Sequence, residues 1–483
     1  MALPPSVSNK SLAALVTTAS PAKVILKLAL PTVFAMLTQS AVNEVDIIFF
    51  SHLPCPESST AQAALFPSLI LLWMFGGSLS AISVGTQAIS ARRFAEGKSI
   101  DAGAVLVNSW VCSLLASIVF TGVGYLVMPL ALHALIRVPE VREAAQGYLN
   151  WRLLGITSMA ATFSFKAFFD GVGKTHVHMV ASVVMNVINV VLCIALIFGH
   201  WGAPRLGMTG AGLAGAASSW VGLLIMVAWA MLSHYRVNFR PFDLTRFAPR
   251  GLAKDILRLS VPSAVATVAV MSGFALFSGI VSHLDSVSHA AVLNPDCPGG
   301  RAEAVNGAAT MMIVGILKLT FTACLAFGTS TATLVSQSLG AGQPDKAARF
   351  GWVSVRLGLL IFGAVGLLEG VFFTKPLLHL VTQSPAVFET ALVPMRMMGL
   401  CTPLIAVGMI LTQALFGAGN TRFVMLVELV LHFFCLVPLA WLFGITLHLG
   451  LPGIWASAAI YVLLLTSVMV WKFRRGDWKT ISI

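Results

Sequence analysis

Long stretches of apolar residues alternate with short polar segments along the whole chain. Each stretch is long enough to cross a bilayer as an α-helix, which needs about 20 mostly apolar residues. Strands of a membrane barrel would instead alternate apolar and polar residues over about 10 positions. Twelve stretches are predicted, near residues 24–51, 61–90, 102–130, 144–170, 175–199, 208–233, 253–283, 305–337, 348–373, 387–417, 421–446 and 451–473. The pattern predicts an all-α integral membrane protein with about twelve transmembrane helices.

The composition agrees with a membrane protein. Hydrophobic residues make up 57% of the 483 positions and charged residues only 10%, whereas water-soluble domains carry about 25% charged residues. A chain this apolar needs lipid as its solvent. The apolar stretch 11–16 is too short for a signal peptide and no clear cleavage site follows it, so we expect the first span to be retained.

The second half of the chain repeats features of the first half at an offset of about half the chain. The turn sequence at 171–175 (GVGKT) corresponds to that at 417–421 (GAGNT), and Gln87 corresponds to Gln337. Internal repeats of this size are typical of two-lobed transporters. Since six spans are predicted in each half, we expect two lobes of six helices.

Lysine and arginine gather in alternate loops of the predicted topology, and the loops between them hold few. By the positive-inside rule, both termini and the basic linker between the halves lie in the cytoplasm. Six spans precede the linker, so the halves run parallel, related by an axis along the membrane normal. The predicted segments are a cytoplasmic N-terminal segment 1–23, an N-terminal lobe 24–233, a basic cytoplasmic linker 234–252, a C-terminal lobe 253–473 and a cytoplasmic tail 474–483.

Nucleic acids and nucleotides are not expected partners. The formal net charge is +12, but the basic residues are spread over loops rather than gathered on one face, which favours a role in topology and in attraction to anionic lipids. The two Gly-rich turns lack the Gly-Lys-Ser/Thr ending and the preceding strand of a phosphate-binding loop. We expect them to be tight cytoplasmic turns in which glycine permits a positive φ. No nucleotide-binding domain is recognised, so ATP is not expected to drive the protein.

The first predicted span carries a polar stripe. Gln39, Asn43 and Asp46 lie at i, i+4 and i+7, on one face of a helix, whereas Glu44 points elsewhere, nearer the outer end. A carboxylate at the centre of a bilayer costs about 2.5–3.5 kcal/mol on insertion scales, and burial favours its protonated form. Asp46 is therefore a candidate for binding and releasing a proton. Alternatively, the stripe only joins helices through hydrogen bonds.

The second half has titratable residues of its own. Glu428 and His432 lie at i and i+4 on the eleventh span, so their side chains can meet, and histidine titrates near neutral pH. They could form a proton relay or a hydrogen-bonded structural pair. Lys318 in the eighth span could pair with Glu428 or with a carboxylate in a cavity, or repel a cationic substrate until it is neutralised.

Other charged residues in the spans have simpler interpretations. Arg152, Lys166 and Asp170 bracket the fourth span. Lys166 and Asp170 lie at i and i+4 near its cytoplasmic end, where a local pair and a snorkelling lysine suffice. Glu369 lies near the outer end of the ninth span and needs no special role.

Five of the seven cysteines lie in apolar spans and are interpreted as small hydrophobic residues. Cys55 and Cys297 lie in outward-facing loops at corresponding places in the two halves. An oxidising outer compartment permits a disulfide between them, and labelling of both by a non-permeant thiol reagent without reductant would contradict it. No metal-ligand spacing is recognised.

Motifs in both halves, taken in order, resemble those of the multidrug and toxic compound extrusion (MATE) transporters. They are LALPTVFAMLTQSAVNEVDIIFFSHL in the first span, VGTQAISARRFAEG with its counterpart TATLVSQSLGAGQPDKAARF, the turns FFDGVGKTHV and FGAGNTRFVM, and NVINVVLCIALIFG. The resemblance runs from residue 28 to about residue 471. It implies two six-helix bundles around a central cavity, and export of organic, usually cationic, compounds by alternating access against inward H⁺ or Na⁺.

Asp46 matches the carboxylate in the first helix of that family. The charged residues that another branch of the family has in the seventh and tenth spans are missing from 272–282 and 400–413. The chain therefore resembles the DNA-damage-inducible F branch more closely.

The chain also departs from that branch. Asn189 in the fifth span is followed one turn later by Cys193 instead of an aspartate, and a threonine frequent in the sixth span is replaced near Gly215. Na⁺ needs several oxygen ligands, of which Asp46, Asn43 and Asn189 could supply some. Because the departures remove oxygen ligands, they favour H⁺ over Na⁺ as the coupling ion.

Other functions remain open at this point. A lipid-linked sugar flippase of the same superfamily would have a strongly cationic cavity, and a channel is also conceivable. An integral membrane enzyme would need clustered His, Asp or Glu near one membrane face, for which His176 and His178 are too sparse. We therefore expect a secondary antiporter rather than an enzyme, a monomer of the cell (inner) membrane without a cofactor. Its expected partners are small organic substrates and membrane lipids.

Overall fold

The computed structural model describes residues 20–54, 57–136, 138–248, 250–288, 291–292, 303–382 and 384–481. These residues are almost entirely helical, apart from a short antiparallel pairing of β1 (Ala291–Val292) with β2 (Glu303–Ala304). They include eleven helical segments long and apolar enough to cross a membrane. A further helix, α6 (Pro139–Gly171), has 33 residues but carries more charge. The predicted all-helical membrane protein is therefore confirmed.

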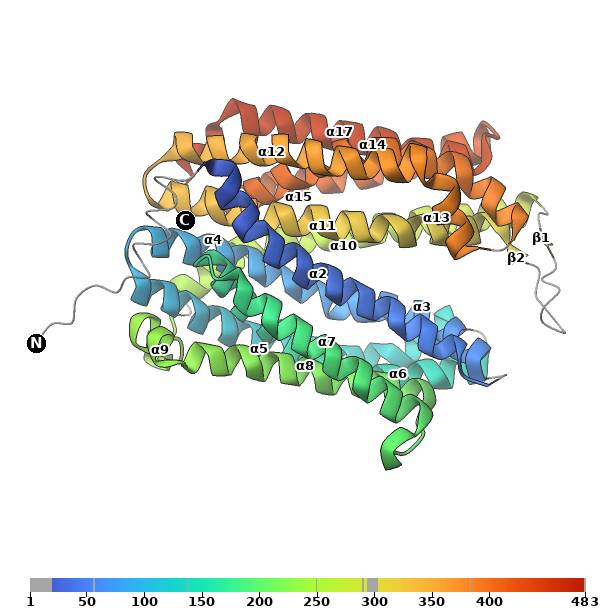
Figure 1. The fold of residues 1–483 in the computed structure, drawn as a ribbon, viewed down its shortest axis with the longest axis horizontal. Helices are drawn as coiled ribbons and strands as arrows, with labels where there is room; N and C mark the ends of the chain where they lie inside the picture. The colour runs from blue at the N-terminus through green and yellow to red at the C-terminus, as the bar shows by residue number, and fades with distance from the viewer. Residues whose placement is uncertain are drawn as a thin grey trace, which may run out of the picture.

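The first half of the chain forms the N-terminal lobe (Figure 1). Its helices are α2 (Pro21–Ser51), α3 (Glu57–Phe75), α4 (Ile82–Ala95), α5 (Ser99–Leu135), α6, α7 (Thr175–Phe198) and α8 (Gly207–Met231). A 3-10 turn at Gly77–Ala81 joins α3 to α4, so the two make one span. The short helix α9 (Ser233–Phe239) follows α8 and leads to the second half.

The second half forms the C-terminal lobe. Its helices are α10 (Leu252–Ser288), α11 (Val305–Gly340), α12 (Pro344–Leu367), α13 (Thr374–Val381), α14 (Pro385–Gly417), α15 (Thr421–Leu431), α16 (Val437–Trp441) and α17 (Gly450–Arg475). Three π-helical turns occur among them, Leu368–Phe372 after α12 and His432–Leu436 and Leu442–Thr446 on either side of α16. Such turns are frequent at functional sites.

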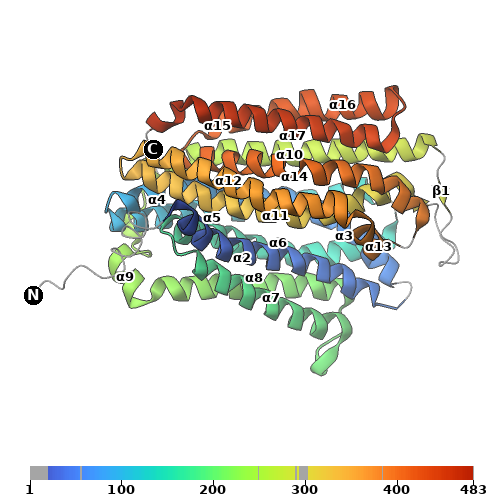
Figure 2. The same cartoon turned by 45° about the horizontal axis from the view of Figure 1, so that its top comes forward.

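The first helix of each half packs against both lobes. α2 contacts α7 of its own lobe and α11 of the other, and it lies along the boundary between the lobes in both views (Figures 1 and 2). Ile25, near its start, is buried in the C-terminal core, and Phe50, at its end, in the N-terminal core. α10 does the reverse, with Ile256 packed against α4 and α5 and Phe277 in the C-terminal core. Each lobe thus holds one end of the other lobe's first helix.

The two Gly-rich turns have the predicted tight geometry. Gly173 and Gly419 have φ of 74° and 87°, which glycine adopts without steric cost. In each turn the following residue donates its backbone N–H to a carbonyl five residues earlier. The distances are 2.7 Å from Lys174 to Phe169 and 2.9 Å from Asn420 to Leu415. The repeat in sequence is therefore a repeat in structure.

The outer surface of the lobes is apolar, as contact with lipid requires. Strongly exposed apolar side chains include Leu115, Ile118, Leu126 and Leu130 on α5, Leu360 on α12, and Phe372. In water such side chains would form extensive apolar patches, whereas in a bilayer they match the hydrocarbon chains. The apolar spans and their exposed side chains together indicate a multi-pass membrane protein.

The two lobes are hydrogen-bonded to each other through the glutamines that correspond in the repeat. Gln87 on α4 donates its Nε2 to the Thr329 carbonyl at 2.9 Å and to the Thr333 hydroxyl at 2.8 Å. Gln337 on α11 donates its Nε2 to the carbonyl of Gly171 at 2.7 Å. Each lobe therefore contributes one glutamine to a reciprocal pair of bonds.

Further bonds surround this pair. Ser336 donates to the Ala88 carbonyl at 2.7 Å, and Arg92 donates to the carbonyls of Ala418 at 2.9 Å and Ile481 at 2.7 Å. We call the donors Gln87, Arg92, Ser336 and Gln337 the inter-lobe latch. It lies at the end of the molecule where α9 and the last described residues lie (Figure 1). The latch closes the boundary between the lobes at this end.

We predict that Gln337→Ala loosens the inter-lobe latch. The change leaves the buried Gly171 carbonyl without this bond, at a cost of about 1–3 kcal/mol. A cysteine introduced at Ala88, which is 1% exposed, should then be alkylated faster by a thiol reagent, with the modified site identified by mass spectrometry.

The matched control for this prediction is Gln343→Ala, since Gln343 is exposed on the turn that follows α11. Its substitution should leave alkylation of the introduced cysteine unchanged. Equal alkylation rates in the Gln337→Ala protein and the unmodified protein would contradict the role of the latch.

Candidate functional site

A cluster of polar side chains lies inside the N-terminal lobe, where four helices meet. We call it the N-lobe cluster. Its members are Asp46 from α2, Tyr148 and Arg152 from α6, Asn189 and Cys193 from α7, and Ser218 from α8. All of them are buried except Arg152, which is partly buried. Polar groups in such a place need partners, because burial without them costs free energy.

Asp46 meets the polar face of α7. The Sγ atom of Cys193 lies 3.8 Å from the Asp46 Oδ1 and 3.8 Å from the Asn189 Oδ1. Asn189 and Cys193 are one helical turn apart, which places both on the face towards α2. The Asn189 amide then donates its Nδ2 to the Ser218 hydroxyl at 3.1 Å. The carboxylate is thus connected across α7 to α8.

Arg152 brings a positive charge into the same cluster. Its guanidinium lies near enough to Asp46 for the two charges to interact, although no ion pair within 4.0 Å joins them in the described residues. The guanidinium carbon lies 5.6 Å from the centroid of the Tyr148 ring, a cation–π distance. The Nε of Arg152 and the hydroxyl of Tyr148 are buried and have no hydrogen-bond partner among the described residues.

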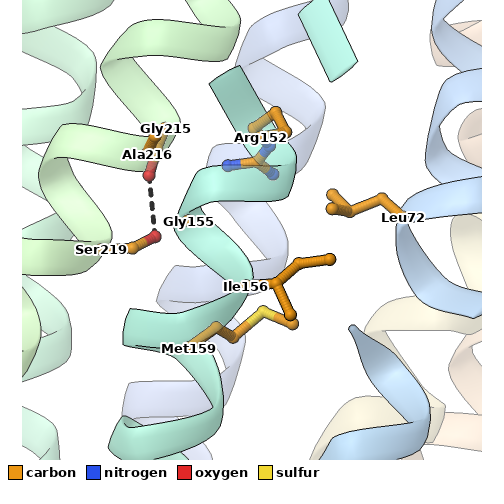
Figure 3. Close-up of a pocket in the computed structure, with 8 residues that line it drawn as sticks. All are labelled: Leu72, Arg152, Gly155, Ile156, Met159, Gly215, Ala216 and Ser219. Atoms are coloured by element: carbon orange, nitrogen blue, oxygen red, sulfur yellow. Dashed lines mark hydrogen bonds between the residues drawn. The ribbon is translucent and has the colours of Figure 1, made fainter. Parts of the chain in front are cut away.

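A glycine on α8 makes room for the guanidinium. A Cβ atom at Gly215 would lie 2.1 Å from the Nη1 of Arg152, so a larger residue would displace the side chain. Figure 3 shows Arg152 reaching from α6 beside Gly215, with Ser219 bonded to the Gly215 carbonyl at 2.7 Å. A cavity of about 30 Å³ opens here between α3, α6 and α8, room for about one water molecule.

The structure brings some of the predicted site residues together and separates others. Asp46 and Asn189 meet in the N-lobe cluster. Gln39 is exposed and is not part of the cluster, although it lies on the same face of α2 as Asp46. The side chains of Asn43 and Glu44 lie outside the described residues. The predicted polar stripe is therefore divided between different surroundings as α2 passes from one lobe to the other.

The C-terminal lobe has a second polar cluster, the C-lobe triad of Glu428, His432 and Tyr461. Tyr461 on α17 donates its hydroxyl to the Glu428 Oε2 at 2.9 Å. The Nδ1 of His432 lies 3.3 Å from the same oxygen and 2.9 Å from the Glu428 backbone carbonyl, to which it donates. Glu428 is 8% exposed and His432 is fully buried. The predicted contact of Glu428 with His432 is confirmed, with Tyr461 as an additional partner.

α10 covers the C-lobe triad. A Cβ atom at Gly273 would lie 2.6 Å from the Cδ2 of His432, so this glycine allows the ring to pack. The ring of Phe274 meets the His432 ring edge to face, with centroids 6.3 Å apart. The Nε2 of His432 is buried there without a hydrogen-bond partner among the described residues. The triad therefore touches the helix that also packs against the N-terminal lobe.

Lys318 lies at the boundary of the lobes and not in the triad. It is partly buried on α11, one turn before Thr322, whose hydroxyl lies 3.2 Å from that of Ser40 on α2. Glu428 takes its partners from α17 and the end of α15 instead. The predicted pairing of Lys318 with Glu428 is therefore wrong, because the two residues lie on different faces of the lobe.

Two further carboxylates in the spans have local partners. Lys166 Nζ lies 3.2 Å from Asp170 Oδ2, so the predicted pair is confirmed, but both side chains are largely buried rather than snorkelling. Glu369 Oε1 accepts a hydrogen bond of 2.5 Å from Thr320. The hydroxyl of Thr333 also donates to the Asp170 backbone carbonyl, which ties this end of α6 to α11.

Five cysteines are free thiols, namely Cys112, Cys193, Cys324, Cys401 and Cys435. Cys193 contacts Asp46, so it is more than a small hydrophobic residue. Cys55 and Cys297, for which a disulfide is predicted, lie outside the described residues. Within the described ranges, no group of three or more His, Cys, Asp or Glu side chains could hold a metal ion.

Sequence reasoning missed Arg152 and Tyr148. Arg152 was expected to bracket the fourth span, whereas it lies thirteen residues inside α6, beside the lobe interior. The available signals were the spacing of Tyr148 and Arg152 by one turn, and a glycine in the neighbouring span. Neither signal says which residues face each other, since that depends on the packing of α6 on α8.

The arrangement of lobes and clusters is similar to that of known transporters. The MatE family model matches residues 31–195 and 302–442. A probable multidrug resistance protein NorM from Thermotoga maritima is 25% identical over 472 residues, covering 95% of this chain and 94% of that protein. The multidrug resistance protein MdtK of Cronobacter sakazakii is 24% identical and covers 94% of this chain and 95% of that protein.

Solved structures show the same fold. A transporter of the MOP superfamily from Pyrococcus furiosus has a TM-score of 0.83 at 22% identity, covering 97% of this chain and 98% of that one. An outward-facing multidrug resistance MATE family transporter also has a TM-score of 0.83, at 21% identity, and covers 96% of this chain and 98% of that one. Two six-helix bundles are thus the architecture of this protein. Since the family model matches more than half of the residues, the chain belongs to the MatE family and is a MATE family transporter.

Proposed function

We propose that the protein exports organic, cationic compounds by alternating access in exchange for inward H⁺, with Asp46 as the coupling carboxylate. The observation that carries the proposal is a buried Asp46 inside the N-terminal lobe, surrounded by the side chains of α6 and α7. The names of the relatives NorM and MdtK, which describe multidrug resistance, support export of varied organic compounds.

A buried carboxylate can couple proton movement to a change of shape. Its charged form is costly in apolar surroundings, so uptake of a proton changes the free energy of the site by several kcal/mol, on the order of its insertion cost. Asp46 lies on α2, whose two ends are buried in different lobes. A change in the packing around Asp46 therefore acts on the contact between the lobes, which alternating access must rearrange.

The surroundings of Asp46 support H⁺ rather than Na⁺ as the coupling ion. A hard cation prefers several oxygen ligands, whereas the nearest side-chain atom of α7 is the sulfur of Cys193. The Asn189 amide uses its Nδ2 on Ser218 and leaves one oxygen towards the site. Protonation needs only the carboxylate itself.

Several finer features belong to the same proposal. Both termini and the linker are proposed to be cytoplasmic, and the ends of the described chain lie at the same end of the molecule as α9, which agrees with this (Figure 1). The resemblance to the F branch, the monomeric state and the absence of a cofactor stay predictions. The alternative of a lipid-linked sugar flippase would be favoured if no organic cation were transported.

We predict that Asp46→Asn abolishes proton-driven transport while the protein still folds, because the amide keeps the shape of the side chain but cannot bind and release a proton. The measurement is uptake of a fluorescent organic cation into vesicles under an imposed pH gradient, together with drug resistance in an efflux-deficient host. Uptake should fall to that of vesicles without the protein. Unchanged uptake would refute the role of Asp46.

Asp345→Asn is the matched control for that prediction. Its side chain is 95% exposed at the start of α12, where it binds Lys479 at 2.8 Å. A salt bridge at such an exposed site contributes about 0–1 kcal/mol. The same aspartate-to-asparagine change should therefore leave uptake and resistance at their original level.

The C-lobe triad is proposed to be a structural hydrogen-bonded group. Glu428→Gln keeps an oxygen that accepts the bond from Tyr461, so we predict that it preserves both folding and proton-driven uptake. Tyr461→Phe removes the donor and should destabilise the protein by about 1 kcal/mol, measured as a lower thermal unfolding temperature in detergent. Loss of uptake in a folded Glu428→Gln protein would instead favour the proton relay.

A further inference from the structure

We propose that Arg152 is a built-in cation of the N-lobe cluster, which takes the place of a metal cation and makes the site selective for H⁺ over Na⁺. The inference rests on the proposed coupling role of Asp46 and goes beyond it, since it assigns the ion selectivity to a different helix and to one residue. Arg152 is thus a specificity-determining residue of transport.

The first observation is that the lobe is built to hold the guanidinium. Gly215 has no side chain where a Cβ atom would lie 2.1 Å from Nη1 and 2.9 Å from the guanidinium carbon of Arg152. The Tyr148 ring supports the guanidinium from the other side at 5.6 Å. Figure 3 shows the side chain directed along the gap between α6 and α8. A long charged side chain kept in this position against lipid-like surroundings needs a compensating charge.

The second observation is the pairing of charges without a closed ion pair. Asp46 interacts electrostatically with Arg152, yet no contact within 4.0 Å is found between them in the described residues. The ionised cluster has one negative and one positive group and is neutral as a whole. A metal cation beside Asp46 would stand close to a guanidinium in a medium of low dielectric, where like charges repel strongly.

The third observation concerns ligands. The atoms that α7 offers to the Asp46 carboxylate are the Cys193 sulfur and, beyond it, the Asn189 Oδ1. The Ser218 oxygen already accepts a bond from Asn189 and donates to the Gly215 carbonyl at 3.1 Å. Too few oxygens remain to replace the water shell of Na⁺. A proton, by contrast, binds to one carboxylate oxygen and needs no such shell.

The fixed cation also changes what protonation does. When Asp46 takes up a proton, the cluster goes from neutral to a net charge of +1, carried by Arg152. A positively charged site disfavours a cationic substrate nearby, so the proton and the substrate exclude each other through charge without sharing an oxygen atom. Exchange of one for the other is the requirement of an antiporter.

The test is the response of the purified protein to Na⁺. Thermal unfolding is measured in detergent in NaCl and in choline chloride of equal concentration, so that ionic strength is matched. The original protein should unfold at the same temperature in both salts. Arg152→Met keeps the length and apolar body of the side chain but removes the charge, and it should gain a saturable stabilisation by Na⁺.

Two further variants show where Na⁺ binds. The Na⁺ response of Arg152→Met should disappear when Asp46→Asn is added, since the carboxylate is then absent. Arg152→Lys keeps a positive charge and should respond no more than the original protein. In vesicles, a Na⁺ gradient should drive uptake of the organic cation by Arg152→Met but not by the original protein.

Three results would overturn the inference: a Na⁺-dependent stabilisation of the original protein, a folded Arg152→Met protein that does not respond to Na⁺, or a response that persists without Asp46. If Arg152→Met does not fold, Arg152→Gln carries the same test with the same outcomes. The unfolding measurement does not depend on transport, so its failure is distinct from that of the proposed function, which is decided by proton-driven uptake in Asp46→Asn.

Discussion

The structure depends most on the burial of opposite charges, Asp46 and Arg152, inside one lobe of a membrane protein. Each charge alone would be costly in surroundings of low dielectric. Together they form a neutral group whose balance a single proton can change. The helices that supply them, α2 and α6, lie on different sides of the lobe interior and are connected through the polar face of α7. Glycine on α8 provides the space that this arrangement needs.

A local change in charge can act over the whole molecule because the first helices cross between the lobes. α2 begins in the core of the C-terminal lobe and ends in that of the N-terminal lobe, and α10 does the reverse. The inter-lobe latch closes one end of the same boundary through glutamines that correspond in the repeat. Since packed helices do not deform continuously, a change beside Asp46 shifts the balance between discrete arrangements of the lobes. The duplication supplies the symmetry, and the N-lobe cluster breaks it.

Much of the fold could be predicted from the sequence, because long apolar runs in lipid have few alternatives to a helix. The Gly-rich turns were predictable for a similar reason, since glycine is required at Gly173 and Gly419. The position of Asp46 on a polar face was also apparent. The N-lobe cluster was only partly predictable, because Arg152 meets Asp46 through the packing of α6 on α8 and not through spacing along one helix. Gln39 shows the same limit, since helical periodicity places it with Asp46 while the crossing of α2 between lobes leaves it exposed.

The central claim is that Asp46 carries the exchanged proton. The most direct measurement adds an organic cation that the protein transports to the purified protein in weakly buffered detergent solution and follows the release of protons with a pH indicator. The account predicts that substrate binding releases protons from the original protein and none from Asp46→Asn. Equal proton release from both proteins would contradict it.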